Sequence, residues 1–215
     1  MNSIANTLKP RFAASKPLRS LVARLALALA ASGALALAAC SPMRGPPPLE
    51  GADIGGAFTL INAQSETVTW DDFRGKYAVV YFGYAYCPDV CPTDMQRTAQ
   101  GLEIVKERNP DLAANIRTTF ITIDPDRDTP AVVGEFAAAF SDDIIGLTGS
   151  PEAIKSAADA FRVYYKKGDV MENGGYLVDH TNIVFLFDPD GNPMAMLPTD
   201  QGADAVADEI EKWAS

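Results

Sequence analysis

The chain has 215 residues, of which 47% are hydrophobic and 21% are charged, a balance that is ordinary for a globular protein with a packed core. This length accommodates one domain with a tail or two. The 18 basic and 28 acidic residues give a net charge of −10 at pH 7. We expect no nucleic-acid partner, because phosphate contacts demand clustered Lys and Arg.

The first 39 residues differ in composition from the rest. Residues 1–24 carry five basic residues and no acidic one, and an uninterrupted apolar run of 15 residues follows from Leu25 to Ala39. A basic region, a short apolar region and small residues before a processing point are typical of an export signal. The run is short for a membrane span, which needs about 20 residues. We predict an export signal or membrane anchor over residues 1–39.

The apolar run ends in LAAC, which resembles a bacterial lipobox, with Cys40 as the lipidated first residue of the mature protein. The alternative is an uncleaved N-terminal anchor. In either case we expect the remainder to lie outside the cytoplasm, tethered to a membrane. Without the five bases of the leader it carries 13 basic and 28 acidic residues, a net charge of −15. Residues 40–52 are rich in Pro and Gly and are predicted to form a flexible spacer before a domain at 53–215.

Strand and helix patterns alternate along this domain. In chain order, the first half is predicted to contain hairpin strands at 57–62 and 66–70, a strand buried on both faces at 77–84, a helix at 92–108, a strand at 117–124 and a helix at 130–140. The second half is predicted to contain a strand at 144–147, a helix at 151–161, hairpin strands at 162–167 and 175–179, a buried strand at 182–188, a strand at 194–197 and a helix at 202–213.

This order of elements predicts an α/β sandwich with a partly parallel sheet. A hairpin followed by a strand, a Cys-bearing turn and a helix is the order of a thioredoxin-like fold. We therefore predict a thioredoxin-like sandwich, in which helices flank a central mixed β-sheet and a hairpin precedes it.

Cys87 and Cys91 lie four residues apart in YFGYAYCPDVCPTDM, after the buried strand and at the start of a predicted helix. A disulfide that closes so short a loop removes little entropy from the unfolded chain, so it would be a poor structural bridge. Side chains at i and i+4 of a helix have Cβ atoms about 5–6 Å apart, so both sulfurs can reach one metal ion or each other. The positive end of the helix favours thiolates. The spacing is one residue longer than the C-x-x-C of thioredoxins, which leaves room for a metal.

His180 is the only histidine, in YLVDHTNIVFLF, at the entrance to a predicted strand. In a thioredoxin-like sheet this segment packs beside the Cys-bearing turn, so a ring nitrogen could face the two sulfurs. Two thiolates and one imidazole form a soft three-coordinate site that suits Cu(I), whereas structural zinc takes four ligands. Asp179 or a backbone carbonyl is expected to orient the ring.

Asp124, Asp126 and Asp128 stand in ITIDPDRDTP at the spacing of a calcium-binding loop. Thr129 occupies the position at which such a loop needs Gly, and a strand rather than a helix leads into it. We instead expect a strand-to-helix loop on the same rim as Cys87, in which Asp128 or Thr129 caps the following helix.

Three stretches together, YFGYAYCPDVCPTDM, ITIDPDRDTP and YLVDHTNIVFLFDPDG, resemble the Sco/SenC family of copper chaperones for cytochrome c oxidase assembly, over about residues 52–214. The resemblance implies a periplasm-facing thioredoxin-like domain anchored at its N-terminus. It implies copper as the bound metal, as Cu(I) and also as Cu(II), with Cys87, Cys91 and His180 as ligands. The implied partner is cytochrome c oxidase subunit II, which the family supplies with copper or whose cysteines it keeps reduced. Other periplasmic copper carriers or thiol reductants are further candidate partners.

Two functions from different classes remain open at this point. A metallochaperone would bind copper and pass it on by ligand exchange. A thiol-disulfide reductase, which is an enzyme, would use Cys87 and Cys91 as a redox couple. His180 discriminates between them, because disulfide exchange needs only the two thiols.

Overall fold

The computed structural model describes residues 45–172 and 174–214. The predicted leader, including Cys40, lies outside the described residues. A compact unit begins at Pro46. None of the helices in the described part of the chain has the length and apolar character needed to cross a membrane.

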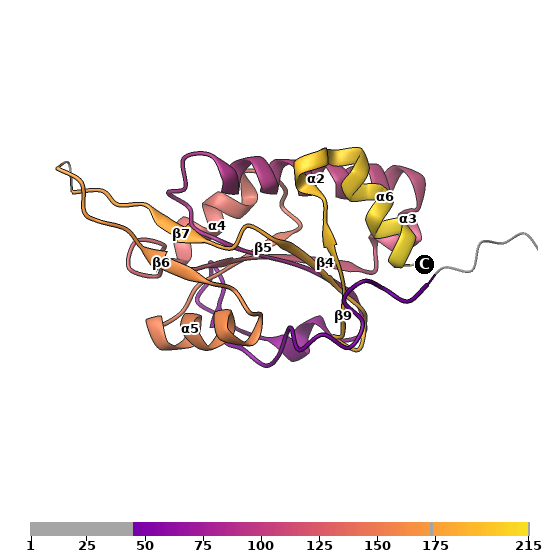
Figure 1. The fold of residues 1–215 in the computed structure, drawn as a ribbon, viewed down its shortest axis with the longest axis horizontal. Coiled ribbons are helices and arrows are strands. Elements are labelled where there is room, and N and C mark those ends of the chain that lie inside the picture. Colours follow the sequence, from indigo (N-terminus) through magenta and orange to yellow (C-terminus); the bar gives the residue numbers. More distant parts are fainter. Residues whose placement is uncertain (1–44, 173, 215) are drawn as a thin grey trace, which may run out of the picture. The chain divides into compact units, whose positions relative to one another are not determined.

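A five-stranded mixed sheet forms the centre of this unit (Figure 1). Its strands, in spatial order, are β5 (Ile144–Leu147), β4 (Ile116–Thr122), β3 (Tyr77–Gly83), β8 (Val184–Phe187) and β9 (Pro193–Leu197). The pairs β3–β4 and β4–β5 are parallel, and the pairs β3–β8 and β8–β9 are antiparallel. The central strand β3 is buried almost throughout, as its continuous apolar sequence predicts for a strand covered on both faces.

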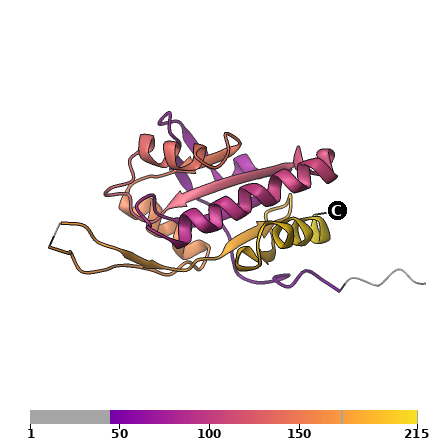
Figure 2. The same cartoon turned by 90° about the horizontal axis from the view of Figure 1, so that it is seen from above.

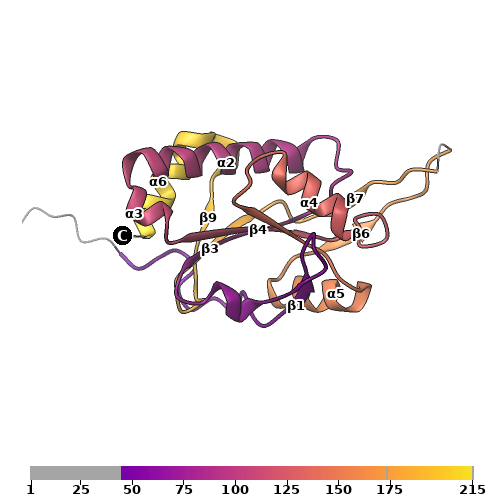
Figure 3. The same ribbon diagram turned by 180° about the vertical axis from the view of Figure 1, so that it is seen from behind.

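Helices cover both faces of the sheet (Figures 1 and 3). One face carries α2 (Val90–Arg108), α3 (Pro110–Ala113), α4 (Pro130–Ala138) and α6 (Ala203–Trp213). The other face carries α5 (Pro151–Ala160) and the 3-10 helix η1 (Trp70–Phe73). The N-terminal hairpin of β1 (Thr59–Ile61) and β2 (Thr67–Thr69) contacts α5. The predicted mixed sheet with flanking helices and an N-terminal hairpin is confirmed.

Two helices begin where their capping residues predict. The side chains of Thr129 and Ser150 accept hydrogen bonds from the backbone N–H groups of Val132 and Ala153, and a proline follows each cap. An aromatic cluster fills the core on the α5 side of the sheet, where the rings of Trp70 and Phe161 meet edge to face at 5.2 Å between centroids.

A second hairpin extends beyond the sheet (Figures 1 and 2). Its strands β6 (Tyr165–Lys167) and β7 (Val178–His180) pair antiparallel and are not part of the five-stranded sheet. The predicted hairpin is therefore confirmed, and its second strand ends at His180.

The start of α2 differs from the prediction. The helix begins at Val90 rather than at Pro92, so Cys91 lies in its first turn, whereas Cys87 lies in the preceding loop. The expectation that both cysteines occupy one helix face is therefore wrong for Cys87. The helix α3 and the 3-10 helices η1 and η2 (Thr199–Gln201) were not predicted, because segments of three or four residues are too short to show a helical period.

Part of the predicted spacer contacts the domain. The backbone N–H of Leu49 donates to the carbonyl of Met194 at 3.0 Å, and the Leu49 side chain packs against the core. These contacts join Leu49 to the compact unit that begins at Pro46.

Candidate metal centre

The fold brings Cys87, Cys91 and His180 together, with their candidate ligand atoms all within 4.8 Å of one another. The Sγ atom of Cys91 lies 3.3 Å from Nε2 of His180, although the two residues are 89 positions apart. Within residues 45–172 and 174–214 this is the single group of three or more His, Cys, Asp or Glu side chains arranged to hold a metal ion.

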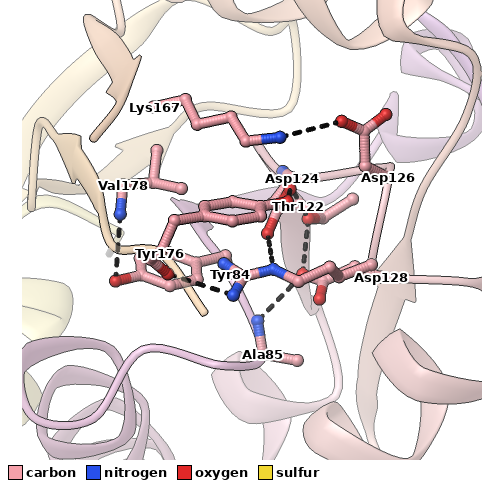
Figure 4. Close-up of polar contacts among 10 residues, drawn as sticks. Tyr84, Ala85, Thr122, Asp124, Asp126, Asp128, Lys167, Tyr176 and Val178 are labelled. Carbon is pink, nitrogen blue, oxygen red and sulfur yellow. Dashed lines mark hydrogen bonds and ion pairs between the residues drawn. The ribbon is translucent and has the colours of Figure 1, made fainter. Parts of the chain in front are cut away.

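Cys87 lies in the loop between β3 and α2, and we call residues 84–89 the Cys loop. The N–H of Cys87 donates to the carbonyl of Tyr84 at 3.1 Å, which closes a turn. The N–H of Ala85 donates to Oδ2 of Asp128 at 2.8 Å, and the hydroxyl of Thr122 donates to the same oxygen at 2.6 Å (Figure 4). A buried carboxylate in the loop between β4 and α4 therefore fixes the Cys loop.

This role of Asp128 was missed by the sequence analysis. Thr129 is the residue that caps α4, whereas the side chain of Asp128 is fully buried and turns toward the Cys loop. Burial raises the pKa of Asp128, and the hydrogen bonds from Thr122 and Ala85 oppose that rise because they stabilise the charged form. The three aspartates of ITIDPDRDTP were the available signal, but their spacing does not reveal that Asp124 and Asp128 are buried whereas Asp126 is exposed.

Cys91 is completely buried in the first turn of α2 and lies against Gly83, the last residue of β3. A Cβ atom at Gly83 would lie 2.9 Å from Sγ of Cys91 and 2.9 Å from Cε2 of Phe120. Only glycine lets the strand approach the sulfur so closely.

Substitution Gly83→Ala is therefore expected to lower the free energy of unfolding by about 1–3 kcal/mol, the usual cost of overpacking, and to weaken metal binding by displacing the Cys91 sulfur. Denaturant titration and metal titration measure the two effects. Gly149→Ala is the matched control, because its Cβ would lie 3.0 Å from Cδ2 of Leu60 and 3.5 Å from the Cβ of Ala153, and neither residue is a candidate ligand. Wild-type stability and metal affinity in Gly83→Ala would contradict this account of the contact.

His180 presents its free ring nitrogen to the sulfurs. Its Nδ1 lies 3.0 Å from the carbonyl of Thr181, and because a carbonyl only accepts, Nδ1 carries the proton. Nε2 therefore has its lone pair directed toward Cys91, as a metal ligand requires. The ring also meets Tyr84 edge to face, at 5.8 Å between centroids. The expectation that a backbone carbonyl orients the ring is confirmed.

The pKa values of the two thiols are shifted in opposite directions. A hydrogen bond from Cys91 lowers the pKa of the Cys87 thiol to about 4, against the effect of burial, and the N–H groups of Asp89 and Cys91 contribute to the decrease. The N–H of Cys91 lies 3.4 Å from Sγ of Cys87, at the positive end of α2. The pKa of Cys91 is raised, because its thiol loses the bond to Cys87 on ionisation and because the site is buried. Cys87 is therefore the thiolate, and a metal must displace the proton that Cys91 retains.

The donor set fits a soft monovalent ion. Two donors that bind one ion at about 2.0–2.3 Å can lie up to about 4.6 Å apart, so the 3.3 Å separation of Cys91 and His180 is compatible with a shared metal. Two sulfurs and one imidazole without a carboxylate favour Cu(I) over hard cations, and the absence of a fourth donor in the group argues against a structural zinc site. Neither Cys87 nor Cys91 is in a disulfide.

Residues 46–215 match the family model described as SCO1/SenC. Among curated proteins, Protein SCO1 homolog 1 of Arabidopsis thaliana is 38% identical over 161 residues, which cover 75% of this chain and 47% of that protein. Protein SenC of Rhodobacter capsulatus is 42% identical over 162 residues, covering 74% of this chain and 70% of SenC. The chain thus spans about half the length of the Arabidopsis relative and a larger share of SenC.

Two solved structures with copper bound are similar to this fold. Bradyrhizobium japonicum ScoI superimposes with a TM-score of 0.67 at 32% identity, over 74% of this chain and 99% of that chain. Arabidopsis thaliana ScoI superimposes with a TM-score of 0.68 at 37% identity, over the same shares. The predicted thioredoxin-like sandwich is confirmed by these neighbours.

Proposed function

The chain belongs to the SCO1/SenC family, and we propose on this basis that it is a copper metallochaperone with Cys87, Cys91 and His180 as the copper ligands. The destination of the copper is the binuclear copper site in subunit II of cytochrome c oxidase, as the family resemblance implies. Copper is here a cargo that the protein acquires and releases.

The observation that carries this proposal is the approach of the sole imidazole to the paired sulfurs, 3.3 Å from Nε2 to Sγ of Cys91. Disulfide chemistry has no need of this third donor, whereas a three-coordinate copper site does. Two similar structures, the ScoI proteins of Bradyrhizobium japonicum and Arabidopsis thaliana, hold copper, which supports the same assignment.

Burial of the ligands suggests how the ion is exchanged. Cys91 is completely buried, whereas Cys87 retains 8% of its surface and His180 is half-buried. The side chains that precede the two cysteines, Tyr86 and Val90, are 54% and 41% exposed. A thiolate of a partner protein therefore approaches from the side of Cys87 and His180, joins the three-coordinate copper, and replaces the ligands one at a time. Tyr86 and Val90 supply apolar contact area for that partner.

Titration of the fully reduced protein with Cu(I), in competition with a chelator, tests the proposal. One tightly bound ion per chain is expected, and prior alkylation of Cys87 and Cys91 should abolish binding. A chain that binds no copper, or that binds it equally well after alkylation, would contradict the assignment.

A membrane tether on the periplasmic side completes the proposal, and its support is the sequence of the leader up to Cys40. When the full chain is expressed in bacteria with a labelled fatty acid, we expect the label on the protein and its loss in Cys40→Ala. An unlabelled chain that still sediments with membranes would instead favour an uncleaved anchor.

Thiol-disulfide reduction is the second candidate function, and a specific observation favours it. The low pKa of Cys87 beside the raised pKa of Cys91 gives one thiolate that attacks and one thiol that resolves the mixed disulfide. In that reaction the Cys87 thiolate attacks a partner disulfide and releases a partner thiolate. Cys91 then gives up its proton to the released partner thiolate and attacks the Cys87 sulfur, which breaks the mixed disulfide, releases the second partner sulfur as a thiolate and leaves the Cys87–Cys91 pair oxidised.

A further inference from the structure

The hairpin that carries His180 is too small to be stable by itself. It consists of three residue pairs between β6 and β7 and is separate from the five-stranded sheet. Two-stranded hairpins are marginally stable in isolation. Several apolar side chains of its outer part are largely exposed, namely Val170, Met171 and Leu177. Contacts with the body of the domain must therefore determine where His180 lies.

Arg127, in the loop between β4 and α4, makes the central contact with this hairpin. One terminal nitrogen of its guanidinium donates to the carbonyl of Tyr176 at 3.0 Å, and Nε donates to Asp124 at 2.5 Å. The hydroxyl of Tyr176 donates to the other oxygen of Asp124 at 2.7 Å. The guanidinium carbon also lies 3.6 Å from the centre of the Tyr176 ring. Tyr176 is therefore bound through its carbonyl, its ring and its hydroxyl.

The same guanidinium reaches the Cys loop. Its carbon lies 5.1 Å from the centre of the Tyr86 ring and 5.7 Å from that of Tyr84, within the range of a cation–π contact. The hydroxyl of Tyr84 in turn accepts the N–H of Val178, in β7, at 3.3 Å (Figure 4). Arg127 thus contacts the Cys loop, which carries Cys87, and the hairpin, which carries His180, although it touches none of the three candidate ligands.

We propose that Arg127 is a positioning residue that holds the β6–β7 hairpin against the Cys loop and thereby keeps His180 at the two sulfurs. The proposal rests on the proposed function, since positioning matters for copper only if His180 is a ligand. Its mechanical part, the attachment of the hairpin, concerns the metal-free protein and can be measured separately.

The test on copper uses Arg127→Met, which retains much of the length of the side chain and removes its charge and hydrogen bonds. We expect the dissociation constant for Cu(I) to rise about 10-fold, the lower end of the effect of residues that orient metal ligands. In a His180→Ala background, the same substitution should have no further effect, because the hairpin then carries no ligand. If Arg127→Met weakened Cu(I) binding by the same factor in the parent and in His180→Ala, Arg127 would not act by positioning His180.

Arg108→Met is the matched control. Arg108 bonds Asp204, Asp208 and Glu211 of α6, so its loss also removes a multiply bonded arginine from the surface, but its partners are not part of the site. The Cu(I) dissociation constant of this variant is expected to equal that of the parent. A loss of Cu(I) affinity as large as that of Arg127→Met would show that removing any positive charge weakens binding, and would overturn the proposal.

Amide hydrogen exchange of the copper-free protein tests the attachment directly. In Arg127→Met, the N–H of Val178 should exchange faster while the amides of the central strand β3 keep their protection. Tyr176→Phe, which removes the hydroxyl that bonds Asp124 and interacts with Lys167 but keeps the ring and the backbone carbonyl, should change exchange in the same direction to a smaller extent and serves if Arg127→Met does not fold. Unchanged exchange in the hairpin of both variants would overturn the proposal. A parent that binds no copper but shows the expected exchange would overturn the proposed function and leave the attachment standing.

Discussion

Replacing His180 with alanine is expected to weaken Cu(I) binding by at least about 100-fold, because loss of a ligand should exceed the 10- to 100-fold cost of losing a group that merely orients one. The two sulfurs remain, so the reduced dithiol should still oxidise to a disulfide, with only the small effect of losing the His180 hydrogen bond that helps to lower the pKa of Cys87. Competition titration with a Cu(I) chelator measures the first effect, and thiol counting during oxidation measures the second.

Asp179→Ala provides the matched control, because Asp179 lies next to His180 in β7 and its side chain is exposed. The control should bind copper as the parent does. If His180→Ala also retained the parental affinity, the three-ligand site would be wrong, and the dithiol couple would be the remaining account.

Substitution Cys87→Ser is expected to remove both candidate activities. The copper site loses Cys87, the ligand that is already a thiolate, and the redox couple loses the sulfur that attacks the partner disulfide. We expect no measurable tight Cu(I) binding and no reduction of a disulfide-bonded peptide by the reduced protein. Because Cys87 lies in a loop before α2 rather than within the helix, the fold should persist, which circular dichroism can verify. Peptide reduction at the parental rate would contradict the assignment of Cys87 as the attacking thiolate.

The same variant tests the direction of the Cys87 pKa. In the parent, the pKa of about 4 keeps Cys87 ionised far below the ordinary thiol pKa of about 8.5. Alkylation of one cysteine should therefore remain fast at mildly acidic pH and should slow only as the pH falls through the low value. Cys87→Ser should abolish this acidic-range reaction of the Cys87–Cys91 pair, since burial still raises the pKa of Cys91 after its bond to the Cys87 sulfur is lost. Fast alkylation of Cys87→Ser near pH 6 would contradict the assigned asymmetry.

Much of the fold was predictable because local patterns determine it. The apolar run at Tyr77–Gly83 predicts a strand covered on both faces, and the structure places it at the centre of the sheet. Thr129 and Ser150, each followed by proline, mark the starts of α4 and α5. The meeting of Cys87, Cys91 and His180 was predictable because the thioredoxin-like strand order carries the segment before β8 to the end of β3.

The hydrogen bonds that hold the site in place were not predictable in the same way. Asp128 binds the N–H of Ala85, 43 positions away, and Arg127 binds the carbonyl of Tyr176, 49 positions away. Such bonds join loops whose sequences have no period, so nothing in the local pattern identifies the partner. The start of α2 was misplaced for a related reason, since Pro92 suits an early helical position but does not show that the helix begins at Val90, between the two cysteines.

Ligand counting by X-ray absorption, on the reduced protein loaded with one equivalent of Cu(I), tests the central claim most directly. The account predicts a first coordination sphere of two sulfur atoms and one imidazole nitrogen, with the nitrogen lost in His180→Ala. A spectrum of two sulfurs alone, identical in the parent and in that variant, would contradict it.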